Sequence, residues 1–265
     1  MSAEPFILEF AGRFAPGDVQ IDYTAEPLPR DPQIELLMAA WPEHVERVTR
    51  AGGVLFNGPM IRYLGHELHA SRVTIRAGAT DFATFYCTNY LNGHLGEAIG
   101  WQHFANPLGI SANVLTADGW ILYGRRSQKV ACHPGTVHAF GGSLEPTDRN
   151  ARGELDIFES MARELREELT LSENEPVELN CLGLVRDPVI RQPELVFDAR
   201  LPLTRRELEE RLGPDDPEHE GIVAVRDEPG ELSRFVQNTP SAVPILIGAL
   251  TLHVRMTNDE VQNDG

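Results

Sequence analysis

The stretch Arg163-Glu164-Leu165-Arg166-Glu167-Glu168-Leu169 decides how this chain is interpreted. At 3.6 residues per turn, its three glutamates fall on one side of a helix, and its two leucines fall on another side in line with Met161. The spacing predicts an amphipathic helix from Asp156 to about Leu171. Asp156 and Glu159 have the spacing of a capping box at the start of that helix.

The three carboxylates of this helix, Glu164, Glu167 and Glu168, indicate one kind of chemistry. Like charges this close repel one another and destabilise a helix unless something neutralises them. Hard divalent cations take oxygen ligands, so the cluster is a candidate platform for Mg²⁺, with Mn²⁺ as an alternative. The other interpretation is a solvated, charge-rich helix in which Arg163 and Arg166 separate the glutamates. The sequence around the helix has to decide between the two.

The residues on either side of the helix predict a β-sheet. Asp118-Gly119 marks a tight hairpin between predicted strands at 110–116 and 120–125. A loop then leads to Val137-His138-Ala139-Phe140 and to Gly141-Gly142. Further along the chain the patterns predict strands at 182–186, 195–201 and 221–225, a helix from the Thr204/Glu207 capping box to Gly213, and a last helix over about 241–254. This order predicts an α+β fold in which helices cover both faces of a mixed sheet, an α/β/α sandwich.

The first hundred residues predict a second α/β unit. Asp31-Pro32 opens a helix that Pro42 splits. Two strands, 60–68 and 71–77, are predicted around a turn at His69-Ala70, and Thr80-Asp81 caps a helix over 82–90. We expect residues 1–105 to form an N-terminal α/β unit that contributes to substrate specificity, residues 106–256 to form a second domain, and residues 257–265 to be a flexible tail.

The composition excludes some partners. The 265 residues carry a formal net charge of −17, which repels nucleic acid and anionic membranes over most of the surface. A small phosphorylated substrate remains compatible, because a bound metal ion reverses the local field. The three cysteines, Cys87, Cys132 and Cys181, lack metal-ligand spacing and are expected to be buried free thiols. With no signal-peptide pattern and no apolar stretch of membrane-spanning length, the chain is expected to be soluble and cytoplasmic.

Three segments together resemble a known family. The string from Arg163 to Leu171 resembles the helical core of the Nudix box, and Phe140-Gly141-Gly142 resembles its Gly-Gly entrance. The strand that ends at Arg125-Arg126 is similar to the one that precedes the box. On these motifs the chain is identified as a member of the Nudix hydrolase superfamily, which implies the Nudix fold for residues 106–256.

Three features depart from the family pattern. Leu155 stands where the family has a glutamate, whose usual task is to brace Arg163. Thr170 stands where the family has a glycine at the end of the helix, although glycine best tolerates a left-handed cap. The loop over 143–155 is also longer than usual. We interpret these changes as marks of a subfamily.

The resemblance assigns roles within the box. Glu164, Glu167 and Glu168 correspond to metal-binding and catalytic carboxylates, and the carbonyl of Gly141 is expected as a further metal ligand. Gly142 and Arg163 are expected to support the site, with Arg163 orienting glutamates rather than touching substrate. A fourth catalytic carboxylate is expected from the loop before the last strand, where Glu218 is favoured and Glu220 is the alternative; a plain solvated acidic loop is the other interpretation.

Other residues are candidates to bind the substrate. An acidic protein needs local cations beside an anionic ligand, and the candidates, with Arg126 first, are Arg125, Arg126, Lys129 and Arg186. Four aromatic residues are candidates to stack on a base, although core packing is the alternative for each: Phe82, Tyr86, Tyr90 and Trp101. Specificity is expected to reside in the N-terminal unit and in the loop 187–194.

The resemblance extends beyond the box. Residues 77–90, 106–110, 125–130 and 213–222 are similar to the animal Nudix enzymes that hydrolyse UDP-glucose and UDP-galactose. This implies a nucleotide sugar as substrate and its cleavage to UMP and a hexose 1-phosphate. Two alternatives stay open: hydrolysis of another nucleoside-diphosphate derivative such as ADP-ribose, a dinucleotide or CoA, and a UDP-sugar sensor with little or no turnover. Many Nudix proteins dimerise, so a homodimer is an alternative to a monomer.

Overall fold

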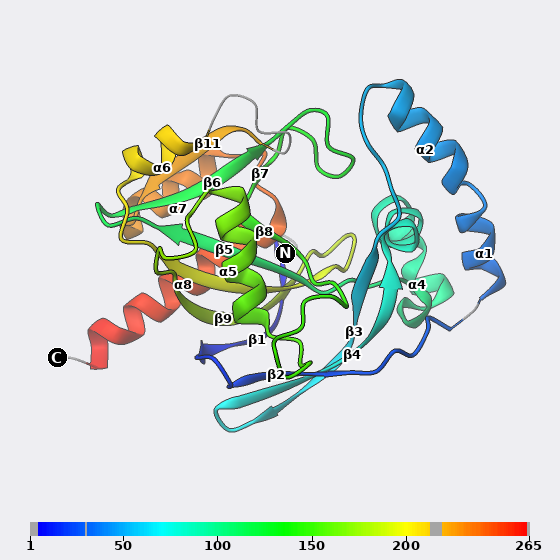
Figure 1. Ribbon diagram of the computed structural model, residues 1–265, viewed down its shortest axis with the longest axis horizontal. Helices are drawn as coiled ribbons and strands as arrows, with labels where there is room; N and C mark the ends of the chain where they lie inside the picture. The colour runs from blue at the N-terminus through cyan, green and yellow to red at the C-terminus, as the bar shows by residue number, and fades with distance from the viewer. Residues whose placement is uncertain (1–4, 30, 213–218, 264–265) are drawn as a thin grey trace.

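The larger of two β-sheets forms the body of the molecule (Figure 1). The computed structural model describes residues 5–29, 31–212 and 219–263, with side chains as far as Asn258. The strand order of this eight-stranded sheet is β1-β9-β10-β5-β6-β11, with β7 paired to β6 and β8 paired to β5. Its strands are β1 (Ile7–Phe14), β5 (Gly109–Leu115), β6 (Trp120–Arg126), β7 (Val137–His138), β8 (Phe140–Ser143), β9 (Glu178–Arg186), β10 (Pro193–Arg200) and β11 (His219–Arg226). Because β10 and β5 are parallel and the other pairs are antiparallel, the sheet is mixed, as predicted.

Helices cover both faces of this sheet, and each face has its own core. Alternation along β5 turns Ile110, Ala112 and Val114 into the core that α5 (Ile157–Glu168) closes, where Met161, Leu165 and Leu169 are fully buried. On the other face Asn113 donates a hydrogen bond to the Ala249 carbonyl of α8 (Pro244–Asn263), whose apolar residues form the second core. Figure 1 shows α5 crossing in front of the sheet. The predicted α+β class and the layered arrangement are confirmed.

Local sequence signals explain how α5 begins and ends. The Asp156 side chain accepts hydrogen bonds from the amides of Phe158 and Glu159, which satisfies two donors of the first turn. Thr170 follows the helix with φ of 53°, the left-handed conformation that the family fills with glycine. Leu155 is buried in the first core, so the position expected to hold a bracing glutamate holds a core residue.

The N-terminal segment contributes to both sheets. The smaller sheet has the order β2-β4-β3, from β2 (Val19–Tyr23), β3 (Pro59–His69) and β4 (Arg72–Asp81). Asp31 caps α1 (Pro32–Met38), and α2 (Trp41–Arg50) follows, so the predicted helix is split in the region of Pro42. Strand β1 instead pairs with β9 of the large sheet. A division into units at 1–105 and 106–256 stays a prediction.

Several elements differ from the sequence-based prediction. The stretch predicted as one helix over 82–90 is α3 (Phe82–Phe85), capped by Asp81, followed by a π-helical turn, η1 (Tyr86–Tyr90). Strands β1 and β2 and helix α7 (Pro229–Asn238) were not predicted, and α8 begins later than predicted and runs through Asn263. The capping box of Thr204 and Glu207 is present and opens α6 (Arg205–Arg211). The remaining short elements are η2 (Gly93–Leu95), α4 (Gly96–Ile99) and η3 (Trp101–His103).

The sequence also predicted buried cysteine thiols and no membrane-spanning segment. Cys87 and Cys181 are buried free thiols, whereas Cys132 is a free thiol that is partly exposed. In the part of the chain that the structure describes, no helix is both long and apolar enough to cross a membrane.

Candidate active site

The two glycines of β8 bring the backbone against the glutamates of α5. Gly141 has φ of 145°, and a Cβ atom at this position would lie 2.1 Å from the Ile110 carbonyl oxygen of β5. A Cβ atom on Gly142 would lie 2.8 Å from Glu164 Oε2. Only glycine, which has no Cβ atom, lets the backbone come this close to β5 and α5. This explains why two glycines stand at the turn.

Two carboxylates of α5 lie at this turn. Glu168 Oε2 accepts a 2.7 Å hydrogen bond from the Gly141 amide, and Glu164 lies against Gly142. Burial raises the pKa of Glu164, and the charge of Glu167 raises it further, while Arg163 opposes both effects. Glu167 is the most exposed of the three, with 61% of its side-chain surface accessible. The backbone and two acidic side chains therefore meet at one point.

Arg163 is held by carboxylates on three sides. Its Nη2 atom lies 2.7 Å from Glu164 Oε1 and 2.9 Å from Asp148 Oδ1, and its Nη1 atom lies 3.2 Å from Glu167 Oε2. Asp148 comes from the long loop after β8, and its side chain is only 7% exposed. Thus Asp148 pairs with Arg163, whereas Leu155, where the resemblance implies a bracing glutamate, is buried in the first core. Sequence reasoning missed Asp148, and the only signal was an unusually long, polar loop.

His219 closes the opposite side of Glu168. Its Nε2 atom lies 4.0 Å from Glu168 Oε1, and its ring packs 5.3 Å from the ring of Phe140. A Cβ atom on Gly124 would lie 2.2 Å from the His219 ring, so the glycine of β6 makes room for it. Of the two loop carboxylates predicted from sequence, Glu218 lies outside the described residues, and Glu220 accepts a 2.8 Å hydrogen bond from the Gln128 amide.

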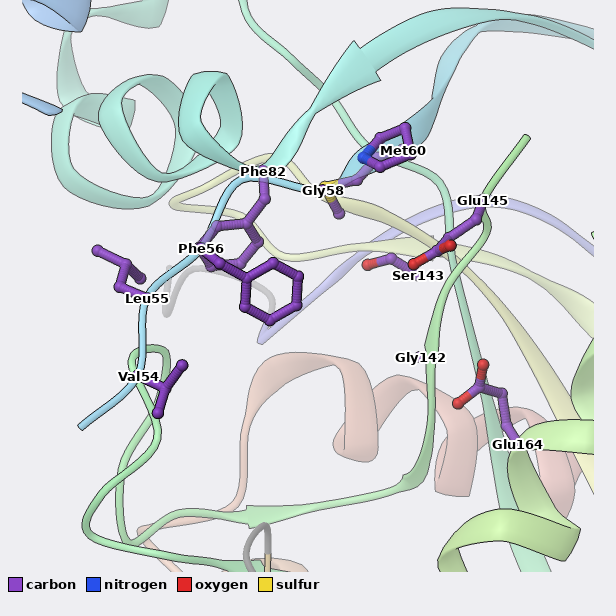
Figure 2. A pocket seen from close by; sticks show the side chains of 11 residues that line it. Val54, Leu55, Phe56, Gly58, Met60, Phe82, Gly142, Ser143, Glu145 and Glu164 are labelled. Carbon is purple, nitrogen blue, oxygen red and sulfur yellow. The ribbon is translucent and has the colours of Figure 1, made fainter. Parts of the chain in front are cut away.

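Two cavities adjoin the Gly141–Gly142 turn. The first has a volume of about 270 Å³ and extends from Glu145 and Glu164 to Val54, Phe56 and Phe82 (Figure 2). The second has a volume of about 200 Å³. Four residues line both cavities, Met60, Phe82, Gly142 and Ser143. The two cavities therefore share part of their lining at this turn.

The second cavity is lined by polar side chains together with Met60, Phe82 and Phe85. Glu194 is the second residue of β10 and is 5% exposed, and burial raises its pKa to about 7, against the opposing effects of Ser111 and the charge of Arg126. Burial also lowers the pKa of His138 to about 3, so this ring is neutral at ordinary pH. Glu194 was not singled out from sequence, because a carboxylate at the start of a strand is ordinarily exposed.

Of the four predicted phosphate-binding cations, only Arg126 lines either cavity within the described residues. Its Nε atom donates to the Cys132 carbonyl at 3.2 Å. Arg125 and Lys129 are exposed nearby on β6 and the loop that follows. Arg186 lies elsewhere, because it pairs with Glu9 at 2.8 Å and packs over the Tyr63 ring.

The predicted aromatic residues have different positions. Phe82 faces both cavities. Tyr86 is buried beside it, and the hydroxyl of Tyr90 accepts a hydrogen bond from the His133 amide. Trp101 packs under Arg191. The two histidines near the turn, His133 and His138, line the second cavity.

The donor set fits a hard cation. Among the described residues, no three His, Cys, Asp or Glu side chains already converge as a metal-binding cluster. The α5 carboxylates nevertheless supply oxygen atoms, which Mg²⁺ prefers.

Comparisons with known proteins agree with the sequence motif. No family model matches the chain. It is 26% identical to the uridine diphosphate glucose pyrophosphatase of Bos taurus, over 88% of this chain and 89% of that protein. It is 30% identical to Nudix hydrolase 9 of Arabidopsis thaliana, over 53% of this chain and 50% of that one. A solved structure, DR0079 from Deinococcus radiodurans, is 18% identical with a TM-score of 0.40, covering 55% of this chain and 81% of its own.

The chain belongs to the Nudix hydrolase superfamily. Relatives similar to it over most of its length, in Bos taurus and in Homo sapiens, carry the name uridine diphosphate glucose pyrophosphatase; the human protein is 25% identical over 84% of this chain and 82% of its own length.

Proposed function

We propose that this protein hydrolyses the diphosphate of a nucleotide sugar with the help of Mg²⁺, and that UDP-glucose and UDP-galactose are its substrates. The reaction class is supported by membership of the Nudix superfamily, and the substrate by the names of relatives that match most of the chain. Mn²⁺ is the alternative metal.

The main structural support for the proposal is that two carboxylates of α5 contact the backbone at the Gly141–Gly142 turn. Glu168 is hydrogen-bonded to the Gly141 amide, and Glu164 packs against Gly142, so two oxygen-bearing side chains converge beside two cavities. With Glu167 and the Gly141 carbonyl, they are the residues that would hold the metal. When bound, Mg²⁺ neutralises charge on the diphosphate and lowers the pKa of the attacking water.

The reaction consumes one water molecule. A water oxygen forms a bond to one phosphorus, the bridging phosphorus–oxygen bond breaks, and the bridging oxygen leaves with the other phosphate. The products are UMP and a hexose 1-phosphate, and the proton lost by the water needs an acceptor. We propose Glu218 as that acceptor, because Glu220 is engaged with the Gln128 amide.

The remaining residues are proposed to support the reaction. Arg163 orients Glu164 and Glu167 through its ion pairs. Arg126, which lines the second cavity, is proposed to balance phosphate charge. Arg125 and Lys129 stay predictions as exposed cations near this cavity. The ion pair of Arg186 with Glu9 favours a structural task for that residue.

Product analysis tests the proposal. Purified protein with Mg²⁺ is incubated with UDP-glucose, UDP-galactose, ADP-ribose, NADH and CoA, and products are separated by chromatography. Glu168→Gln keeps the shape of the side chain and removes its charge, and we expect it to lower kcat by about 100-fold or more, since a metal supplies several kcal/mol. Glu159→Gln makes the same chemical change at an exposed position of the same helix and should leave kcat unchanged.

Each outcome has a defined meaning. Release of UMP and hexose 1-phosphate from the UDP-sugars alone, lost in Glu168→Gln, supports reaction, substrate and site together. Turnover of ADP-ribose, NADH or CoA instead would retain the reaction class and overturn the substrate. Binding of UDP-glucose without any turnover would overturn the enzymatic proposal in favour of a sensor.

A further inference from the structure

An apolar wall faces the candidate metal-binding side of the turn. It consists of Val54, Leu55, Phe56 and Phe82, and we call it the aromatic wall. Figure 2 shows Phe56 and Phe82 on one side of the first cavity, with Ser143, Glu145 and Glu164 on the other side. Val54 is 76% exposed and Phe56 is 73% exposed. Large apolar side chains at a cavity that also contains a reactive carboxylate indicate a place for an apolar ligand group.

The two rings of the wall are supported differently. Phe82 is held by neighbouring rings, lying 6.1 Å from Tyr86 and 6.0 Å from Phe85 between ring centroids. Phe56 lies above Gly58, whose added Cβ atom would be 3.5 Å from the Phe56 ring, and leaves most of its surface in water. Thus Phe82 is a fixed platform, while Phe56 has a free aromatic face.

We propose that the aromatic wall receives the nucleobase of the substrate, with Phe56 stacking on it, so that the base determines binding at the first cavity. This inference rests on the proposed function, because it places a nucleotide across the turn. Every base has a π-face that can stack on an aromatic ring, which makes such contacts strong and tolerant of the identity of the base.

The contrast between the two cavities sets the direction of the substrate. The second cavity offers the buried Glu194 carboxylate, Arg126 and His138, which are groups that hydrogen-bond to sugar hydroxyls or pair with phosphate. In the first cavity the polar residues Ser143, Glu145 and Glu164 lie on one side, and the aromatic wall on the other side offers no hydrogen-bonding side chain. A base therefore gains more at the aromatic wall, and a hexose gains more beside Glu194.

The position of the diphosphate agrees with this direction. Gly142 and Ser143 line both cavities, and Glu164 lies directly against Gly142. A nucleotide sugar with its base at Phe56 and its hexose at Glu194 therefore has its diphosphate over the turn that carries the glutamates. The volume of the first cavity, about 270 Å³, lies below the roughly 300–1,000 Å³ of pockets that enclose a whole drug-sized ligand, which agrees with its receiving only one part of a nucleotide sugar.

Substitution of Phe56 tests the stacking contact. We compare Phe56→Ala and Phe56→Tyr with Leu36→Ala, which removes a 75% exposed apolar side chain of α1 as a matched control. Phe56→Ala is expected to raise KM for UDP-glucose about 5- to 100-fold with kcat changed much less, while Phe56→Tyr and Leu36→Ala stay near the wild-type values. Because Phe56 is mostly exposed, its loss leaves the fold intact, which circular dichroism verifies.

Product inhibition shows which half of the substrate Phe56 contacts. In Phe56→Ala the inhibition constant of UMP is expected to rise by the same factor as KM, and that of glucose 1-phosphate to stay unchanged. Calorimetric titration with UMP gives the same comparison without turnover, so a failure of the proposed enzymatic function leaves this test valid. Equal UMP affinity in wild type and Phe56→Ala would overturn the inference, as would a weakened inhibition by glucose 1-phosphate alone.

Discussion

Removal of the Asp148 charge tests whether the long loop after β8 braces Arg163 beside the candidate metal-binding glutamates. Asp148 Oδ1 accepts from Arg163 Nη2 at 2.9 Å, and Asp148 Oδ2 accepts from the Glu145 amide at 2.8 Å. Asp148→Asn keeps the size of the side chain and one acceptor oxygen. It removes the charge and leaves Arg163 to pair with Glu164 and Glu167 alone.

The burial of the two partners sets the expected magnitude. Exposed ion pairs contribute about 0–1 kcal/mol, whereas breaking a buried pair costs about 3–5 kcal/mol. Here the Asp148 side chain is 7% exposed and that of Arg163 is 41% exposed, so the pair lies between these limits. We expect Asp148→Asn to lower the free energy of unfolding by about 1–2 kcal/mol.

Urea denaturation and Mg²⁺ titration measure the two consequences. The urea midpoint should fall with an unchanged m-value. The concentration of Mg²⁺ that gives half-maximal activity should rise about 10-fold or more, because a residue that orients metal ligands contributes on that scale. A double-mutant cycle with Arg163→Met isolates the pair. A coupling energy below about 0.3 kcal/mol would refute the bracing contact.

Three further predictions concern stability and are measured by urea denaturation. Thr170→Gly should stabilise the protein by about 0.5–1 kcal/mol, because relief of left-handed strain at φ of 53° exceeds the added entropy of the unfolded chain; a loss of stability would contradict this. Thr204→Ala should destabilise it by about 1 kcal/mol, because the hydroxyl that accepts from the Glu207 amide is lost while the backbone amide of residue 204 still donates to Glu207; an unchanged midpoint would show that the hydroxyl cap contributes nothing. Buried His253, between Asp198 and Asp227, has its pKa raised to about 9 from 6.5 by those carboxylates against the opposing effect of burial. Its stabilisation is therefore complete below about pH 6.5 and is lost as pH rises toward 9, a dependence that His253→Gln should remove.

The features that sequence predicted correctly depend on residues close together in the chain. The apolar stripe of α5 repeats every three or four residues, and its cap at Asp156 contacts the next turn. The hairpin at Asp118-Gly119 joins β5 and β6 as expected. Each of these patterns involves contacts between residues only a few positions apart, so the spacing of residues in the sequence is enough to predict the helix and the hairpin. Strand β1 was missed because its pairing with β9, across most of the chain, decides its structure.

The sequence by itself determined the superfamily, the helix that carries Glu164, Glu167 and Glu168, and the Gly141–Gly142 turn, because each can be recognised from one short motif. Only the tertiary structure decided which distant residues complete the site. Asp148 pairs with Arg163, His219 lies beside Glu168, and Phe56 faces Glu164 across a cavity. An acid in a long loop and an exposed phenylalanine look ordinary in sequence. Their roles arise when packing of the two sheets and α5 brings separate segments within contact distance, which no local pattern records.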